Sequence, residues 1–272
     1  MKQRIQRILA VIDPARNEQW ALNKAVAIAA GGDDIEVVAY ACVTSYLECE
    51  DVDALREAEM ARFQPWLAGI IAKIDAAGVQ ITPRIDWDPD WREAIHIAAD
   101  DIGADLIVKR ASGRASTLSN SDRRVLRTAS CDVLLVKREP RAQTRRILVA
   151  LNPNAKDKEH QKLDEMIVGV ANRIRANQPD LEIHAVSAYR ESDNFIHPPD
   201  LARRAGVDRA HAHVREGATV KVISEIAREL DVDVVLIGSV ARKGLAGLTI
   251  GNTAEKILGG VTSDILSVSD RA

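Results

Sequence analysis

Aromatic side chains are scarce in this chain. Two Phe, three Tyr and four Trp occur among 272 residues, whereas hydrophobic residues make up 46% of the total. The core must therefore be built mainly from Ile, Val, Leu and Ala, which suits the buried strands and Ala-rich helices of an α/β protein. The length is sufficient for one large domain or two ordinary ones.

Cysteine, an excess of one charge and long apolar runs are lacking as well. The three cysteines (Cys42, Cys49 and Cys131) are an odd number without metal-site spacing, and two of them lie in apparent strands. The formal net charge is −3, which indicates no general affinity for nucleic acid or membranes. No stretch is long enough to span a bilayer, and no apolar signal core follows the N-terminus. We therefore expect a cytoplasmic protein with no direct contact to nucleic acid or membrane.

The chain contains one internal repeat. The matched segments are 7–14 with 146–153, 93–108 with 222–237, and 131–136 with 263–268. Each half has the usual size of a domain, so we predict two tandem domains, 1–139 and 145–272. The segment 137–144 between them is short, charged and broken by Pro140, so the halves should pack against each other as a pseudo-dimer.

Strands and helices alternate within each half, and each half ends on a strand. Strands are predicted at 6–12, 35–42, 80–86, 105–109 and 132–137, and again at 146–151, 181–188, 209–215, 233–238 and 264–268. Helices are predicted at 15–30, 51–76, 90–102, 120–129, 157–176, 218–230 and 251–259. Segment 190–200 is expected to be a loop before a short helical piece near 201–205. Continuous apolar strands predict two doubly wound, Rossmann-like parallel sheets, which bind ligands where the strand order reverses.

A glycine-rich loop in the second half is the main candidate site. It follows a buried strand and precedes a predicted helix, so its backbone N–H groups and the helix N-terminus are suited to holding phosphate. The candidate binding residues are Asn152, Gly238, Ser239, Ala241, Arg242, Gly251, Asn252 and Thr253. Alternatively, the loop only turns the chain, with Asn252 as the N-cap of the last helix and Glu255 completing a capping box.

The corresponding loop of the first half has lost its glycines. Lys109 stands where Gly238 does, Ser119 stands where Gly251 does, and the loop is three residues shorter between these matched ends. Lys109, Arg110 and Arg114 remain available to bind an anion through side chains. We do not expect a glycine-cradled nucleotide site in this half.

These residues together resemble the universal stress protein family in its tandem two-domain form. The resemblance is carried by residues 11–14, 105–109, 134–137 and, most specifically, 248–255. The nucleotide loop of that family has a glycine, two residues, a second glycine, nine residues, and then Gly followed by Ser or Thr. Here Gly238 comes first, Ala241 replaces the second glycine, and Gly251-Asn252 ends the motif at the same spacing.

The resemblance implies adenine-nucleotide alpha-hydrolase-like domains that associate through their last strands. It implies a ligand-binding regulatory or protective protein of the stress response, with links to DNA-damaging and oxidative stress. The expected ligand is ATP or a related nucleotide or other small anion in the second domain, with or without magnesium. Asn152 occupies the place of the family's base-contacting Asp, which is Asp13 in the first half. Protein partners and a homodimer of whole chains are compatible with this interpretation.

Two other functions stay open, although we expect no enzyme. One is slow ATP hydrolysis or self-phosphorylation on Ser239, Thr249 or Thr253, against which no general base or metal-binding carboxylate is evident. The other is a scaffold that binds a protein or an apolar ligand and no nucleotide. Asp157, Glu159, Asp164 and Glu165 are interpreted as a charged helix face without a special role.

Two smaller clusters have both a structural and a functional interpretation. His184, His211 and His213 are expected on one face of adjacent strands, where three imidazoles could bind zinc, but packed or solvent-facing histidines are favoured. Trp87 and Trp91 flank a turn above the first sheet. They are interpreted as a lid on the core or an interface patch rather than the wall of a ligand groove.

Overall fold

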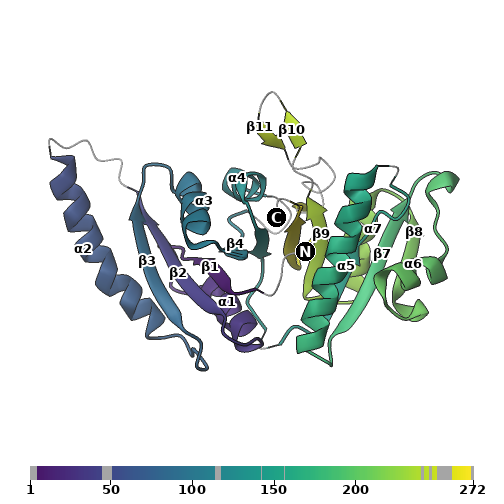
Figure 1. Cartoon of the computed structure of the whole chain (residues 1–272), viewed down its shortest axis with the longest axis horizontal. Coiled ribbons are helices and arrows are strands. Elements are labelled where there is room, and N and C mark those ends of the chain that lie inside the picture. Colours follow the sequence, from purple (N-terminus) through teal and green to yellow (C-terminus); the bar gives the residue numbers. More distant parts are fainter. Residues whose placement is uncertain are drawn as a thin grey trace.

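A computed structural model describes residues 5–44, 51–113, 118–141, 143–155, 157–239, 242–244, 247–249 and 259–270. The first half contains β1 (Arg7–Val11), α1 (Trp20–Ala30), β2 (Glu36–Val43), α2 (Val52–Ile71), β3 (Ile81–Trp87), α3 (Trp91–Ile102), β4 (Leu106–Arg110), α4 (Asn120–Thr128) and β5 (Asp132–Val136). The second contains β6 (Arg146–Ala150), α5 (Lys158–Asn177), β7 (Glu182–Tyr189), η1 (Ser192–Asn194), α6 (Pro198–Ala205), η2 (Arg209–His211), β8 (Ala212–Glu216), α7 (Thr219–Glu229), β9 (Val234–Ser239), β10 (Arg242–Gly244), β11 (Gly247–Thr249) and β12 (Asp264–Ser269). Figure 1 shows the two halves side by side, joined through their sheets.

The two halves share one sheet of ten described strands in the order β3-β2-β1-β4-β5-β12-β9-β6-β7-β8. Within each half the neighbouring strands are parallel, and the strand order reverses between β1 and β4 and again between β6 and β9. This arrangement confirms the predicted tandem α/β fold with a doubly wound parallel sheet in each domain.

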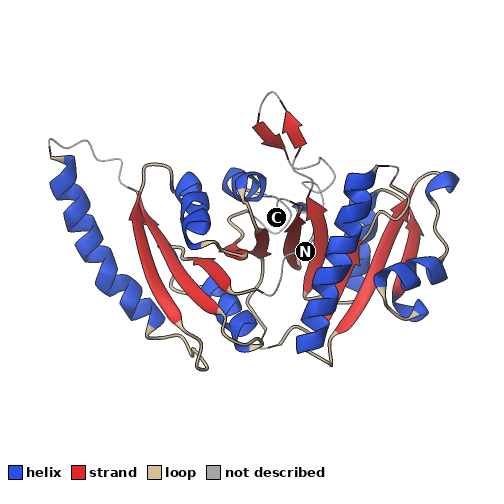
Figure 2. Cartoon of the chain, viewed as in Figure 1, coloured by secondary structure: helices blue, strands red, loops and turns tan. Residues whose placement is uncertain are grey.

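Helices cover both faces of the sheet (Figure 2). Helices α1, α2, α5 and α6 pack on one face, and α3, α4 and α7 pack on the other. Successive strand residues alternate between the two cores: in β1, Ile8 and Ala10 face the first set of helices, and Leu9 and Val11 face the second. Because both of their faces are buried, central strands such as β1, β5 and β6 are almost wholly apolar, which is why they were recognisable in the sequence.

The domains join through an antiparallel pair, β5 with β12. The contacts at this pair are nearly symmetric: Asp264 Oδ1 accepts a hydrogen bond from Lys137 N at 2.9 Å, and Asp132 Oδ1 accepts one from Ser269 N at 3.0 Å. Lys24 Nζ lies 3.4 Å from Asp264 Oδ2, and both side chains are buried. The predicted packing of the halves through their last strands is therefore confirmed, with the first domain also reaching the joint through α1.

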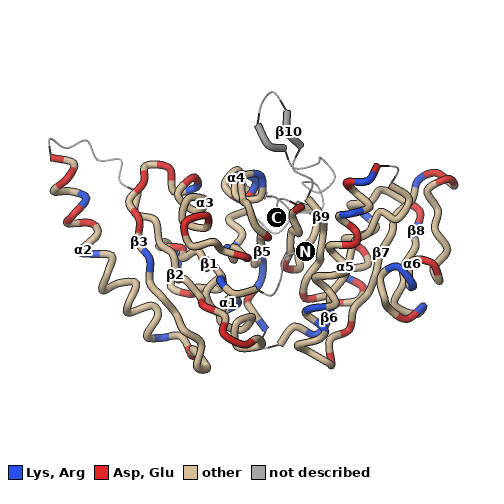
Figure 3. The backbone as a smooth tube through the Cα atoms, in the orientation of Figure 1, with Lys and Arg blue, Asp and Glu red and all other residues tan. Residues whose placement is uncertain are grey.

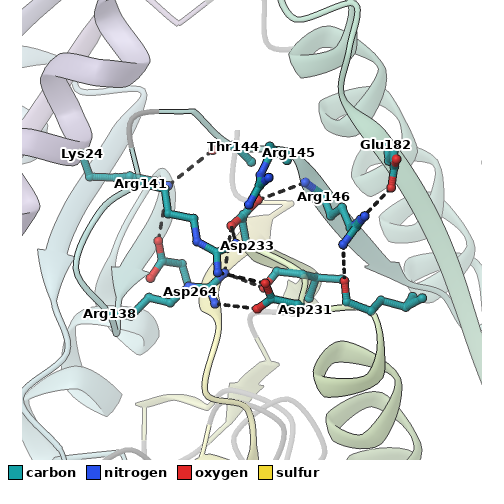
Figure 4. Close-up of polar contacts among 12 residues, drawn as sticks. Lys24, Arg138, Arg141, Thr144, Arg145, Arg146, Glu182, Asp231, Asp233 and Asp264 are labelled. Atoms are coloured by element: carbon teal, nitrogen blue, oxygen red, sulfur yellow. Dashed lines mark hydrogen bonds and ion pairs between the residues drawn. The ribbon is translucent and has the colours of Figure 1, made fainter.

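The segment between the domains is held by a buried carboxylate, Asp233 (Figure 4). Its Oδ1 accepts hydrogen bonds from Arg138 Nη2 at 3.0 Å and Arg141 Nη1 at 2.9 Å. Its Oδ2 accepts from the backbone N–H groups of Arg145 at 2.6 Å and Arg146 at 3.0 Å. The predicted domain boundaries, residues 139 and 145, lie beside these contacts, which tie both ends of the connecting segment to the second domain.

Four predicted elements differ from the structure by three residues or more, and the predicted helix 251–259 lies outside the described residues except for its last residue. Helix α2 ends at Ile71 rather than at residue 76. Helix α1 begins at Trp20 rather than at residue 15, because the Gln19 side chain hydrogen-bonds to Asp13 N, Asp13 O and Arg16 O and holds the preceding loop. Helix α6 begins at Pro198 rather than at residue 201, with proline in the first turn where no backbone donor is needed. Strand β8 starts at Ala212, since residues 209–211 form a 3₁₀ turn.

Charged side chains of both signs alternate along the backbone of both domains (Figure 3). Within the described residues, no helix is both long enough and apolar enough to cross a membrane. Of the described cysteines, Cys131 is buried and Cys42 is half-buried.

Candidate functional site

The predicted site in the second domain lies where the strand order reverses. Strands β6 and β9 are direct neighbours, with Val149 opposite Leu236, so their carboxyl ends share one edge of the sheet. Asn152 follows the end of β6, and Gly238 and Ser239 are the last residues of β9. The structure thus brings these three predicted residues to the same edge.

The other predicted residues fall largely outside the described part of the chain. Ala241, Gly251, Asn252 and Thr253 lie outside the described residues, and of Arg242 only the backbone is described. Their role in binding stays a prediction.

The glycine-rich loop contains a small hairpin that the sequence interpretation missed. Strands β10 and β11 are antiparallel, with Arg242 opposite Thr249 and Gly244 opposite Gly247. Figure 1 shows this hairpin standing beyond the end of β9, away from the main sheet. The sequence between these two strands contains no Asn-Gly, Asp-Gly or Gly-Gly pair, which is the usual local signal for a two-residue hairpin.

Gly238 has a packing role that is independent of any ligand. A Cβ at this position would lie 3.0 Å from Leu163 Cδ1 and well inside van der Waals contact with Leu163 Cγ and Cδ2. Leu163 is a buried residue of α5, so the missing side chain lets this helix approach β9 closely. In the first domain Lys109 takes the matched place, and its buried side chain extends to Asp122.

Asp164 is a carboxylate at the second-domain edge. Its two oxygens accept hydrogen bonds from Asn152 N at 3.1 and 3.0 Å. Burial raises the pKa of Asp164 to about 6, against the lowering effect of the Asn152 hydrogen bond. The sequence interpretation placed Asp164 on a plain charged helix face, because nothing local to α5 indicates that this position meets the end of β6.

In the first domain, a protein carboxylate occupies the features that would hold a phosphate. Asp122 Oδ1 accepts from Lys109 Nζ at 2.7 Å, and Oδ2 accepts from Ser112 N at 2.9 Å and Ser119 N at 3.3 Å. Asp122 is fully buried in the first turn of α4, where Ser119 is the N-cap of a capping box. Burial opposes ionisation, but the Lys109 ammonium and the hydrogen bonds hold the pKa of Asp122 below its usual value.

A cavity of about 420 Å³ lies beside this ion pair, at the reversal point of the first sheet. Three of the chain's few aromatic residues line it: Tyr40 from β2, Phe63 from α2 and Trp91 from the start of α3. Cys42 of β2 and Asp13 line it as well. The interpretation of Trp91 as a lid or interface residue is thus incomplete, because that side chain forms part of a cavity wall.

The three histidines of the second domain do come together. The ring centroids of His184 and His211 are 4.3 Å apart, and His184 Nδ1 lies 3.2 Å from His213 Nε2. Burial, followed by the neighbouring imidazoles, lowers the pKa of His184 to about 4, so that ring is neutral at pH 7. Among the described residues there is no group of three or more His, Cys, Asp or Glu side chains arranged to hold a metal. The packed-histidine interpretation is therefore the one that the geometry favours.

A scan against family models matches residues 4–137 and 171–269 to the model described as "Universal stress protein family". The chain belongs to the universal stress protein family. It is 25% identical to universal stress protein E of Escherichia coli, over 97% of this chain and 93% of that protein. It is 23% identical to the universal stress protein E homolog of Haemophilus influenzae, over 97% of both chains.

Solved structures of universal stress proteins share this tandem arrangement. A putative universal stress protein from Pseudomonas aeruginosa superposes with a TM-score of 0.76 at 26% identity, covering 97% of this chain and 93% of that one. A universal stress protein from Archaeoglobus fulgidus gives a TM-score of 0.73 at 16% identity, covering 99% and 100%, which supports the fold alone. The resemblance inferred from the sequence motifs, in the two-domain form of universal stress protein E, is therefore confirmed.

Proposed function

We propose that this universal stress protein is a cytoplasmic, ligand-binding regulator or protector in the stress response. It binds ATP or a related nucleotide in the second domain, with or without magnesium, and does not turn it over. The observation that carries this proposal is the shared edge formed by Asn152, Gly238 and Ser239 at the strand-order reversal, where α/β sheets bind ligands. The length-wide similarity to universal stress protein E supports the assignment to stress response.

Each described residue at this edge has a definite chemical capacity. The Asn152 side chain offers one donor group and one acceptor to a base or ribose, and the Ser239 hydroxyl offers one of each. Asp164 holds the Asn152 backbone in place, so it acts as a positioning residue. Bound nucleotide would regulate the protein only by binding one conformation or partner-bound state more tightly than another.

A titration of the full-length protein with ATP, followed by isothermal calorimetry, tests this proposal. We expect saturable binding that Asn152→Ala and Asn252→Ala each weaken about tenfold, the size of one lost hydrogen bond to a charged or polar ligand group. Asn194→Ala, at an exposed position of the 3₁₀ turn η1, is the matched control and should bind ATP as the wild type does. Absence of heat and of saturation at millimolar ATP refutes a nucleotide function.

Slow ATP hydrolysis is a second candidate, favoured by Asp164. A carboxyl with a pKa of about 6 at the ligand edge is suited to accept a proton near neutral pH. If this activity exists, radiolabelled ATP should be hydrolysed by the wild type, and Asp164→Asn should abolish turnover while ATP still binds. Binding without turnover in the wild type excludes this candidate and leaves the regulatory one standing.

A further inference from the structure

We propose that the first-domain cavity is a second ligand site, for an uncharged aromatic molecule of one to three rings that carries a hydrogen-bond acceptor. The site is formed by Tyr40, Phe63 and Trp91 and is separate from the second-domain edge. The proposal does not depend on nucleotide binding in the second domain.

The phosphate position of this half is already filled. The Asp122 carboxylate uses the Lys109 ammonium and the N–H groups of Ser112 and Ser119, so a phosphate here would meet a buried negative charge. Arg110 is also engaged, since its guanidinium carbon stacks 3.5 Å from the centre of the Trp20 ring. Two of the three cations that the sequence offered for anion binding, Lys109 and Arg110, are therefore engaged within the protein, and Arg114 lies outside the described residues. The buried Asp122 charge disfavours a phosphate-bearing ligand.

The Tyr40 hydroxyl is a buried polar group without a strong partner in the chain. Tyr40 is fully buried, and no oxygen or nitrogen of the described residues pairs with its hydroxyl. Its partner among these residues is the Cys42 thiol, a weak hydrogen-bonding group. Burial, reinforced by Cys42 and Asp86, raises the Tyr40 pKa, so the hydroxyl keeps its proton and is a donor. Since buried hydroxyl groups are nearly always paired, this one points to an acceptor supplied from outside the chain.

Most of the cavity wall is apolar, although Asp13, Lys109 and Arg110 also line it, and such a wall favours a flat apolar molecule. Phe63 of α2 and Trp91 of α3 contribute aromatic rings to the wall, and Ile12 and Ile95 contribute aliphatic surface. A volume of about 420 Å³ lies in the range of small-molecule sites. An aromatic ligand would stack on these rings while its acceptor reached Tyr40, which combines a large apolar contact with one orienting hydrogen bond.

The probe for testing this site is 6-propionyl-2-dimethylaminonaphthalene, an uncharged two-ring dye with a ketone acceptor and environment-sensitive emission. We expect one dye per chain with blue-shifted emission on titration into the full-length protein. Tyr40→Phe keeps the ring and removes the hydroxyl, so it should weaken dye binding about fivefold. Millimolar ATP should leave the dye emission unchanged, because Asp122 excludes the phosphates.

Two tryptophan substitutions in one exposed loop separate this cavity from surface adsorption. Ala15 lines the cavity, so Ala15→Trp should weaken the dye at least tenfold by filling its mouth. Asn17 is exposed two residues away and is not part of the lining, so Asn17→Trp should bind as the wild type does. Equal binding by both variants, unchanged binding by Tyr40→Phe, displacement by ATP, or no binding at all would each overturn the proposal. Circular dichroism confirms that each variant is folded.

Discussion

The packing of Gly238 against Leu163 makes a quantitative prediction about Gly238→Ala. The added methyl group would lie too close to three atoms of Leu163, a side chain buried between α5 and the sheet. Overpacking of this kind lowers the free energy of unfolding by about 1–3 kcal/mol. Alanine has less conformational freedom than glycine in the unfolded chain, which offsets this loss by up to about 1 kcal/mol. We therefore expect a net loss of about 1–2 kcal/mol in the free energy of unfolding.

A double-mutant cycle isolates this contact. Leu163→Ala alone should cost about 2–5 kcal/mol, because it leaves a cavity under α5. With Leu163 truncated, Gly238→Ala meets no obstruction and should be neutral or slightly stabilising, so the two changes should couple by about 1–3 kcal/mol. Gly69→Ala is the matched control, since nothing lies within 4 Å of a Cβ at that site on helix α2, and it should stabilise by up to about 1 kcal/mol.

Differential scanning calorimetry of the four variants, together with ATP titration, completes the test. Each kcal/mol should move the melting temperature by about 2–4 °C in a chain of this size. If Gly238→Ala melts like the wild type but loses ATP affinity, the glycine serves close approach of a phosphate and the packing argument is wrong. If stability falls and the Leu163→Ala background restores it, Gly238 is explained by helix packing.

Three further predictions concern buried carboxylates. Asp122→Ala removes the counter-charge of the Lys109 ammonium and leaves the space of the carboxylate empty, so we expect a loss of about 3–5 kcal/mol in calorimetry. Inorganic phosphate should raise the melting temperature of this variant but not of the wild type. The pKa of Asp164 is about 6 in the folded protein, against an ordinary value of 3.8, so ionisation of this carboxyl destabilises the fold. The free energy of unfolding of the wild type, relative to that of Asp164→Asn, should therefore fall by about 2–3 kcal/mol as the pH rises from about 4 to 6. A difference that stays constant over this pH range contradicts the prediction. Asp264→Ala removes the acceptor for Lys137 N at the domain joint and leaves the buried Lys24 ammonium without its counter-charge, so it should cost about 3–5 kcal/mol. Proteolysis that is no faster between the domains than in the wild type would count against this.

The sequence predicted the fold well because the signals for it are local and repeated. Apolar runs such as 147–151 are strands covered on both faces, and the repeat showed that each half forms the same unit. Errors occurred at element ends: the start of α1 depends on the Gln19 amide folding back on the Asp13 loop, and the start of α6 depends on Pro198 fitting the first turn. Both are side-chain or proline effects that hydrophobic periodicity does not report.

The candidate site was predicted only in part. The alignment of the two halves correctly placed Asn152 and Gly238 at one edge of the second sheet, since parallel strands bring their carboxyl ends together. It missed Asp164, which reaches the same edge from α5. It also missed the first-domain cavity, because Tyr40, Phe63 and Trp91 come from three separate elements with no shared motif.

By itself, then, the sequence determined the tandem α/β architecture, the family and the edge where a ligand is expected. These follow from periodicity, internal repetition and loop spacing, which are properties of neighbouring residues. Only the tertiary structure decided that Asp122 pairs with Lys109 and accepts from the loop N–H groups beside it, and that Gly238 makes room for Leu163. Burial and ion pairing between residues that are distant in the chain depend on how the helices pack against the sheet, which only the assembled fold shows.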